Sequence, residues 1–168
     1  FADAAPDALA PWKPLSGNWE LADGVYREFS DREFPGTQGA WTVAGDASWS
    51  EYSLHATVGA GDSQGGILFQ FYRRDAGNYY LLRHEQLPGG VIQVKLLACV
   101  AGRLDVLAGI DNGTEPWLSD VAGIRPGSPP ARFTIHAREG RIVVMINGRR
   151  IISLADSTHR SGGIALGG

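Results

Sequence analysis

Residues 65–85 constrain the fold of this chain most strongly, because their side chains alternate with a period of two. Two sets of side chains interleave there: Ile67, Phe69 and Phe71 in one, and Leu68, Gln70 and Tyr72 in the other. Such alternation is typical of a strand with two different faces. Residues 73–78 follow with turn chemistry, including a Gly-Asn pair that tolerates positive φ, and residues 79–85 return as a second strand. The stretch therefore predicts a central antiparallel hairpin.

The rest of the chain repeats this pattern of short apolar runs and turn residues. Its 168 residues fit one domain, and its 23 glycines and nine prolines are spread between the runs. Further strands are expected at residues 17–21, 25–29, 40–43, 51–59, 91–100, 104–110, 132–138, 141–146, 149–154 and 162–168. Residues 111–130 are too rich in proline and glycine for a regular element.

These strands predict an all-β protein, an antiparallel jelly-roll β-sandwich of two packed sheets with almost no helix. We expect residues 1–168 to form a single β-sandwich domain. Residues 1–14, rich in alanine and proline, are expected to be an extended segment that leads into it.

Composition excludes several classes of function and leaves the compartment open. The net charge of −3 provides no basic field for nucleic acid or anionic lipid. No apolar run approaches the roughly 20 residues that a membrane span needs. The single cysteine, Cys99, lies in an apolar run and is predicted to be buried. Low cysteine content suits the cytoplasm or a bacterial exported protein. Since residue 1 is Phe and one explanation is a removed signal peptide, we expect an extracytoplasmic protein, periplasmic or secreted.

Several motifs along the chain point to one superfamily. They are Gly-Asn-Trp at 17–19, Trp-Ser-Glu-Tyr-Ser-Leu at 49–54, Gly-Gly-Ile-Leu-Phe at 65–69, Asn-Tyr-Tyr at 78–80, Ile-Asn-Gly-Arg at 146–149 and Gly-Gly-Ile-Ala-Leu at 162–166. With them the chain resembles the concanavalin A-like lectin/glucanase superfamily, in the branch of laminin-G-like and bacterial 3-keto-disaccharide hydrolase-like domains. The resemblance implies the jelly-roll fold. It implies little about activity, because these motifs are turn glycines and core aromatics.

The chain departs from the superfamily at two points. The Glu-x-Asp-x-x-Glu run of the glucanase branch does not occur in the sequence. The resemblance also implies one more strand after residues 162–166. Without that strand, residues 162–168 or their neighbour are predicted to present an unpaired sheet edge. An exposed edge would favour either an accessory subunit docked on a larger extracytoplasmic assembly, including a membrane-associated one, or a C-terminus that extends further.

Polar side chains on the central strands are the candidate binding site. Placing the apolar alternates inward leaves seven side chains pointing outward from adjacent strands: His55, Gln70, Tyr72, Arg83, Glu85, Gln93 and Lys95. Tyr79 is expected to join them. Aromatic rings with Arg, Glu and Gln groups suit the hydroxyls and C–H faces of a sugar. The same set suits a protein partner, and it also fits a solvated face with ion pairs.

The five tryptophans divide into two groups. Four lie near turn signals in strand context and are expected to fill the core: Trp12, Trp19, Trp41 and Trp49. Trp117 lies in the irregular segment and is predicted to be exposed, available to a ligand.

Catalytic and metal signatures are weak. Residues 61–65, Gly-Asp-Ser-Gln-Gly, fit Gly-x-Ser-x-Gly, but a strand follows where a nucleophile elbow needs a helix, so Ser63 is not assigned as a nucleophile. The four histidines are scattered without metal-ligand spacing. We therefore expect no cofactor and no metal. Ca²⁺ at Asp62 or Asp111 is the open alternative, although the loops show no acidic cluster.

The sequence thus favours a non-catalytic recognition module that binds a glycan on the polar sheet face. An accessory subunit bound to a larger protein complex is the first alternative. A glycoside hydrolase-like enzyme acting on a modified disaccharide is the second, and it rests on the resemblance alone.

Overall fold

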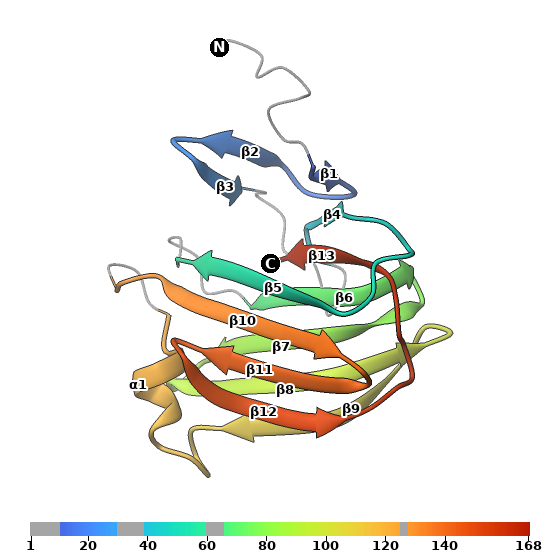
Figure 1. Ribbon diagram of the computed structural model, residues 1–168. Helices are drawn as coiled ribbons and strands as arrows, with labels where there is room; N and C mark the ends of the chain where they lie inside the picture. The colour runs from blue at the N-terminus through green and yellow to red at the C-terminus, as the bar shows by residue number, and fades with distance from the viewer. Residues whose placement is uncertain (1–10, 30–38, 60–65, 125–127) are drawn as a thin grey trace.

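Two antiparallel sheets face each other in the computed structural model of the protein, with a separate two-stranded hairpin beside them (Figure 1). The structure describes residues 11–29, 39–59, 66–124 and 128–168. The larger sheet consists, in spatial order, of β1 (Lys13–Pro14), β4 (Trp41–Ala44), β13 (Gly163–Gly167), β6 (Ile67–Asp75), β7 (Asn78–Leu87), β8 (Val91–Val100) and β9 (Arg103–Asp111). The smaller sheet consists of β12 (Arg149–Ala155), β11 (Arg141–Ile146), β10 (Ala131–Arg138) and β5 (Tyr52–Val58). The predicted antiparallel β-sandwich is confirmed.

The central hairpin is also confirmed, and its turn is shorter than predicted. β6 and β7 pair with Phe69 opposite Leu82 and Phe71 opposite Tyr80. The strands extend to Asp75 and from Asn78, so only two residues turn the chain. The polar residues 73–75 continue β6 because strand pairing satisfies their backbone groups even where their side chains face water.

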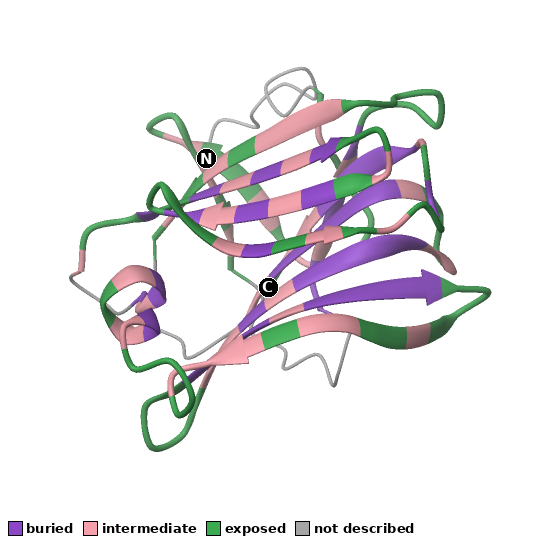
Figure 2. Ribbon diagram, turned by 60° about the horizontal axis from the view of Figure 1, so that its bottom comes forward, coloured by how far each residue is buried: buried purple, intermediate pink, exposed green. Residues whose placement is uncertain are grey.

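The core lies between the two sheets and contains aromatic side chains from both. Phe69 of β6 and Phe133 of β10 are almost fully buried, with ring centroids 5.1 Å apart. Burial alternates along β10 and β11, as expected of strands with one solvent-facing side. In β6, β7 and β8, by contrast, runs of four or more consecutive residues are buried. These strands are largely purple in Figure 2.

The consecutive burial marks a second apolar cluster on the outer face of the larger sheet. This outer apolar cluster consists of Leu68, Tyr79, Leu81, Leu97 and Cys99, with Trp41 and Leu104 packed against it. Cys99 is 1% exposed, so its predicted burial is confirmed. The middle of the larger sheet is therefore largely apolar on both faces, with the buried Gln70 as a polar side chain among the described residues there.

The predicted exposed edge at the C-terminal strand is wrong. β13 lies inside the larger sheet and pairs with β4 on one side and β6 on the other. Its glycines permit this close approach: a Cβ on Gly163 would lie 2.7 Å from the Ala44 carbonyl oxygen, and one on Gly167 would lie 2.8 Å from the Trp41 ring. The edge strands of this sheet are β1 and β9. The prediction of an accessory subunit therefore loses its basis, because it depended on this exposed edge.

The hairpin of β2 (Trp19–Ala22) and β3 (Val25–Glu28) is joined to the larger sheet by aromatic side chains. Trp19 stacks on Tyr26 with ring centroids 4.9 Å apart, and the Tyr26 hydroxyl lies 2.9 Å from the hydroxyl of buried Thr42. Of the segment expected to lead into the domain, residues 1–10 lie outside the described residues, and β1 follows at 13–14.

Helix α1 (Leu118–Ala122) closes one end of the sandwich, within the segment that was expected to be irregular. Leu118 and Ala122 are fully buried in the core. The His84 Nε2–H donates to the Ala122 carbonyl at 2.6 Å, and the Asn147 amide donates to the Val121 carbonyl at 2.9 Å. In Figure 1 α1 lies at the left end, and the turn between β10 and β11 lies at the opposite end. Within the described ranges no helix has the length and apolarity to cross a membrane.

Replacing Gly162 by alanine is expected to destabilise the fold by about 2–4 kcal/mol. Gly162 precedes β13 with φ +148°, and a Cβ there would lie 2.3 Å from the Tyr72 carbonyl carbon and 2.5 Å from the Arg73 nitrogen. Backbone must therefore move. The matched control is Gly148→Ala, since Gly148 also has positive φ (+80°) but open space around it. Urea unfolding midpoints compare the two variants. Equal losses in both would contradict the steric explanation.

Stability is expected to fall with pH below about 6.5 because of His84. Burial lowers the pKa of His84 from its usual 6.5, against a smaller opposite effect of the bond to the Ala122 carbonyl. The native state keeps the ring neutral while the unfolded chain takes up a proton below pH 6.5. The unfolded state then binds more protons, so the free energy of unfolding falls by up to about 1.4 kcal/mol per pH unit until the folded pKa is reached.

The test compares denaturant midpoints between pH 7.5 and 5.5 in the wild type, His84→Gln and His55→Gln. The glutamine at 84 retains an N–H donor and cannot titrate, so the loss of stability should be smaller in His84→Gln. His55 is exposed, and its variant should follow the wild type. An unchanged pH dependence in His84→Gln would show that other groups cause it.

Candidate functional site

The structure distributes the predicted site residues over four places. Four of them form a polar strip on the outer face of the larger sheet, namely Arg83, Glu85, Gln93 and Lys95. On this face Gln70 lies opposite Leu81 and Tyr79 lies opposite Cys99, and Leu81 and Leu97 separate Tyr79 from the strip. Tyr72 lies between the sheets, His55 on the smaller sheet and Trp117 beside α1.

The polar strip is a compact set of paired donors and acceptors. Arg83 lies opposite Lys95, and Glu85 lies opposite Gln93, on the adjacent strands β7 and β8. Arg83 forms an ion pair with Glu85, and the Lys95 ammonium donates to the Gln93 side-chain oxygen at 2.9 Å. The side chains of Arg83 and Glu85 are 32% and 18% exposed. The strip is thus half-buried and held in place by its own contacts, and its three charged groups and its one amide border the solvent.

Gln70 and Tyr79 share the face of the strip but are not accessible. Each is 6% exposed. The Gln70 side-chain oxygen accepts a hydrogen bond from Arg73 Nε at 2.9 Å. Tyr79 packs in the outer apolar cluster, where burial, with a smaller contribution from Cys99, raises the pKa of its hydroxyl to about 12. Neither side chain is therefore available to a ligand.

The predicted outward position of Tyr72 is wrong. A bulge separates Phe71 from Asp75 in the β6–β7 ladder, and Tyr72 within it has φ +48°. The bulge reverses the alternation, so the side chain turns into the core and is 4% exposed. Its hydroxyl accepts from the Glu51 N–H at 3.2 Å and donates to the Ala137 carbonyl at 2.7 Å.

His55 was expected on the same face as the strip, and that placement is also wrong. It lies on β5 of the other sheet, where Nδ1 is 3.2 Å from the Thr134 hydroxyl. Its ring meets that of His136 edge to face, with centroids 6.0 Å apart. The strand predicted at residues 51–59 is present as β5, but its assignment to the central sheet was wrong.

Two of the tryptophans also differ from expectation, whereas Trp12 and Trp41 pack against the apolar clusters as expected. Trp49, expected in the core, is 44% exposed. Trp117, expected to be exposed, is partly covered by Arg149, whose guanidinium lies 3.5 Å from the ring centroid. This cation–π contact occupies one face of the Trp117 ring, and the indole N–H donates to Glu115.

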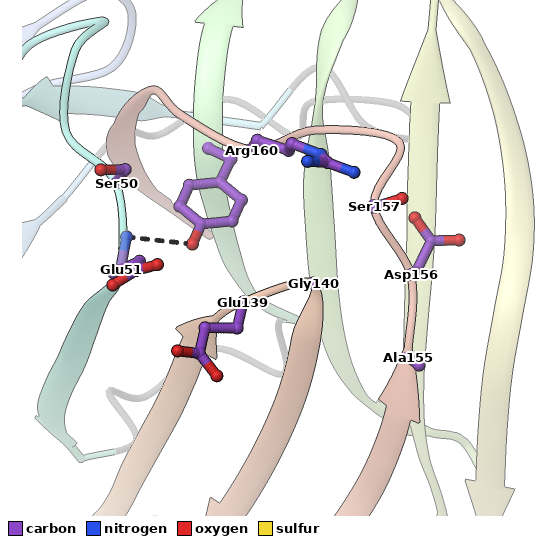
Figure 3. A pocket seen from close by; sticks show the side chains of 9 residues that line it. Ser50, Glu51, Glu139, Gly140, Ala155, Asp156, Ser157 and Arg160 are labelled. Atoms are coloured by element: carbon purple, nitrogen blue, oxygen red, sulfur yellow. Dashed lines mark hydrogen bonds between the residues drawn. The ribbon is translucent and has the colours of Figure 1, made fainter.

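A cavity of about 630 Å³ opens at the end of the sandwich opposite α1, and the sequence did not predict it (Figure 3). We call it the end pocket. Its lining comes from the start of β5, the β6 bulge, the β10–β11 turn and the segment after β12: Ser50, Glu51, Tyr72, Glu139, Gly140, Ala155, Asp156, Ser157 and Arg160. The Glu-Gly turn at 139–140 was recognisable in the sequence, but its proximity to Glu51 depends on how the sheets pack.

Asp156 is the most firmly held carboxylate in the end pocket. It accepts hydrogen bonds from the Tyr80 hydroxyl and from the Thr158 N–H, the latter at 2.9 Å. Although burial opposes ionisation, these hydrogen bonds lower the pKa of Asp156. The carboxylate is therefore a fixed negative charge at the edge of the pocket.

No group of three or more metal-ligating side chains occurs in the described part of the chain. Of the two aspartates considered for Ca²⁺, Asp62 lies outside the described residues, as does Ser63. Asp111 accepts from the Thr114 N–H at 2.9 Å, so its carboxylate stabilises the turn after β9.

Comparisons with solved structures identify the fold. The carbohydrate-binding module CBM66 from Bacillus subtilis superposes with a TM-score of 0.66 at 19% identity, over 92% of this chain and 85% of that one. A β-1,3-1,4-glucanase (lichenase) derived from a mouse hindgut metagenome gives 0.58 at 13% identity, over 92% and 78%. A Caenorhabditis elegans galectin gives 0.50 at 12% identity, over 80% and 85%.

Sequence comparison adds one partial relative. An extracellular exo-α-L-arabinofuranosidase from Streptomyces chartreusis is 32% identical over 65 residues. The match covers 39% of this chain and 7% of that protein, so the chain corresponds to a small part of the relative. No family model matches the chain. The structural likenesses establish that this chain has the concanavalin A-like β-sandwich fold that its motifs indicated.

Proposed function

We propose that the chain is a carbohydrate-recognition domain and that the polar strip contacts the sugar. The observation that carries the proposal is the strip itself: a guanidinium, a carboxylate, an amide and an ammonium at adjacent positions on two strands. Sugar hydroxyls both donate and accept hydrogen bonds, so a fixed set of mixed donors and acceptors suits them. The superposed carbohydrate-binding module supports the same class of ligand by its name.

The half-buried state of the strip favours binding without a large rearrangement. Arg83 and Glu85 restrict each other's rotamers through their ion pair, and Lys95 and Gln93 do the same. Side chains ordered before binding lose little further entropy when a ligand arrives. The name of the arabinofuranosidase leads us to propose an extracytoplasmic location and to include arabinans among the ligands to be tested.

An enzymatic function is the second candidate, because the partial relative is a hydrolase and one superposed structure is a glucanase. Glycoside hydrolysis needs two carboxyl groups across the scissile bond, one of them a desolvated general acid. Glu51 and Glu139 of the end pocket are both exposed. We therefore place recognition ahead of hydrolysis. Release of reducing sugar by the wild type, abolished in Glu51→Gln or Glu139→Gln, would reverse that order.

Calorimetry with arabinan, β-glucan and xylan oligosaccharides tests the recognition proposal. Arg83→Ala and Gln93→Ala should each weaken binding by roughly tenfold, the scale of one hydrogen bond to a charged or polar partner. His55→Ala on the other sheet is the matched control and should leave affinity unchanged. Unfolding midpoints verify that the variants fold. Wild-type protein that binds no sugar of a broad glycan panel at millimolar concentration would contradict the proposal.

A further inference from the structure

We propose that the end pocket is a second binding site, separate from the polar strip, and that it takes an uncharged, hydroxyl-rich group such as the terminal glycosyl unit of a glycan. Its volume of about 630 Å³ lies within the range of small-molecule sites, about 300–1,000 Å³. It opens at the end of the sandwich that α1 does not close (Figure 1). Glu85 of the strip lies toward the other end of β7, next to His84, which bonds to the Ala122 carbonyl of α1.

The lining of the pocket is polar and offers unused hydrogen-bonding groups. Figure 3 shows Glu51 and Glu139 on one side of the pocket, with Arg160 across from them. In the described part of the chain, none of these three charged groups has a hydrogen-bond or ion-pair partner. Two carboxylates accept hydrogen bonds from hydroxyls, and one guanidinium donates to ring or hydroxyl oxygens. Serine hydroxyls from 50 and 157 add groups of both kinds.

The pocket is held open by main-chain contacts between its walls. The Asp156 N–H donates to the Gly140 carbonyl at 2.8 Å, which ties the end of β12 to the β10–β11 turn. The Glu51 N–H is held by the Tyr72 hydroxyl at 3.2 Å. Glu51, Tyr72 and Glu139 have φ values of +53°, +48° and +49°, and they are three of the six non-glycine residues with positive φ in the described chain. Residues held in this region cluster where a site is preformed.

Three features define the class of ligand. The carboxylates of the pocket do not form a group that holds a metal, among the residues described, so the pocket favours an organic ligand. The aromatic residue in its lining, Tyr72, is buried, and its hydroxyl already accepts one hydrogen bond and donates another. Recognition would therefore proceed through hydrogen bonds and without stacking on a ring. Three carboxylates, those of Glu51, Glu139 and Asp156, against one guanidinium disfavour uronic acids and sulfated sugars.

The test uses amide chemical shifts of the ¹⁵N-labelled chain during titration with neutral arabinose, glucose and xylose trisaccharides and with trigalacturonic acid. A neutral trisaccharide should shift the amides of Glu51, Gly140 and Ser157. Glu139→Gln should weaken that response by roughly tenfold, because one charged acceptor is lost. Glu20→Gln, on the β2–β3 hairpin, is the matched control and should behave as the wild type. Trigalacturonic acid should bind at least tenfold more weakly.

The outcomes separate this inference from the proposed function. Shifts confined to Arg83, Gln93 and their neighbours would leave the strip proposal intact and overturn the pocket. Shifts confined to the pocket would support the pocket and overturn the strip. Trigalacturonic acid binding in the pocket as tightly as the neutral sugars would overturn the assigned ligand class. No shift with any probe at millimolar concentration would overturn both sites.

Discussion

The hydroxyl of Tyr72 is the polar contact on which the geometry of the sandwich end depends. The residue belongs to β6 of the larger sheet, yet its hydroxyl bonds to the backbone of the smaller one at two points, the Glu51 N–H just before β5 and the Ala137 carbonyl in β10. The Tyr52 hydroxyl reciprocates by accepting the Tyr72 N–H at 2.7 Å. Apolar packing holds sheets together without fixing how far one slides over the other, whereas hydrogen bonds are directional. This exchange between two tyrosines therefore sets the relative position of the sheets where the end pocket opens.

Local signals in the sequence predicted most of the strands. Turns such as Asn147-Gly148 specify a hairpin within a few residues, and period-two alternation assigns the faces of the strands beside it. The faces of β5 and the strand β8 at 91–100 followed from this pattern. The position of each strand within the sheets did not follow from this pattern. That β13 lies between β4 and β6 depends on contacts about a hundred residues apart in the chain, which no short pattern encodes.

The candidate sites show the same contrast between what a local pattern predicts and what depends on contacts between distant segments. The polar strip was predictable because Arg83, Glu85, Gln93 and Lys95 lie on consecutive strands joined by one turn, so alternation alone places them on one face. Tyr72 was misplaced because the bulge between Phe71 and Asp75 reverses the alternation, and no turn signal marks the bulge. The end pocket was missed because its lining comes from four separate segments, which meet only when the sheets have packed.

The interior position of β13 has a consequence for the order in which the protein can assemble. Strands β6 to β9 each pair with the next strand in the sequence, and so do β10 to β12. Both sets can therefore pair as soon as they are synthesised. The strand β4 reaches β6 only through β13, so the larger sheet stays in two pieces until residue 167 has left the ribosome. Until then both pieces carry an open row of backbone donors and acceptors. Between the synthesis of β6 and that of β13, the nascent chain thus exposes an edge that the folded sheet conceals.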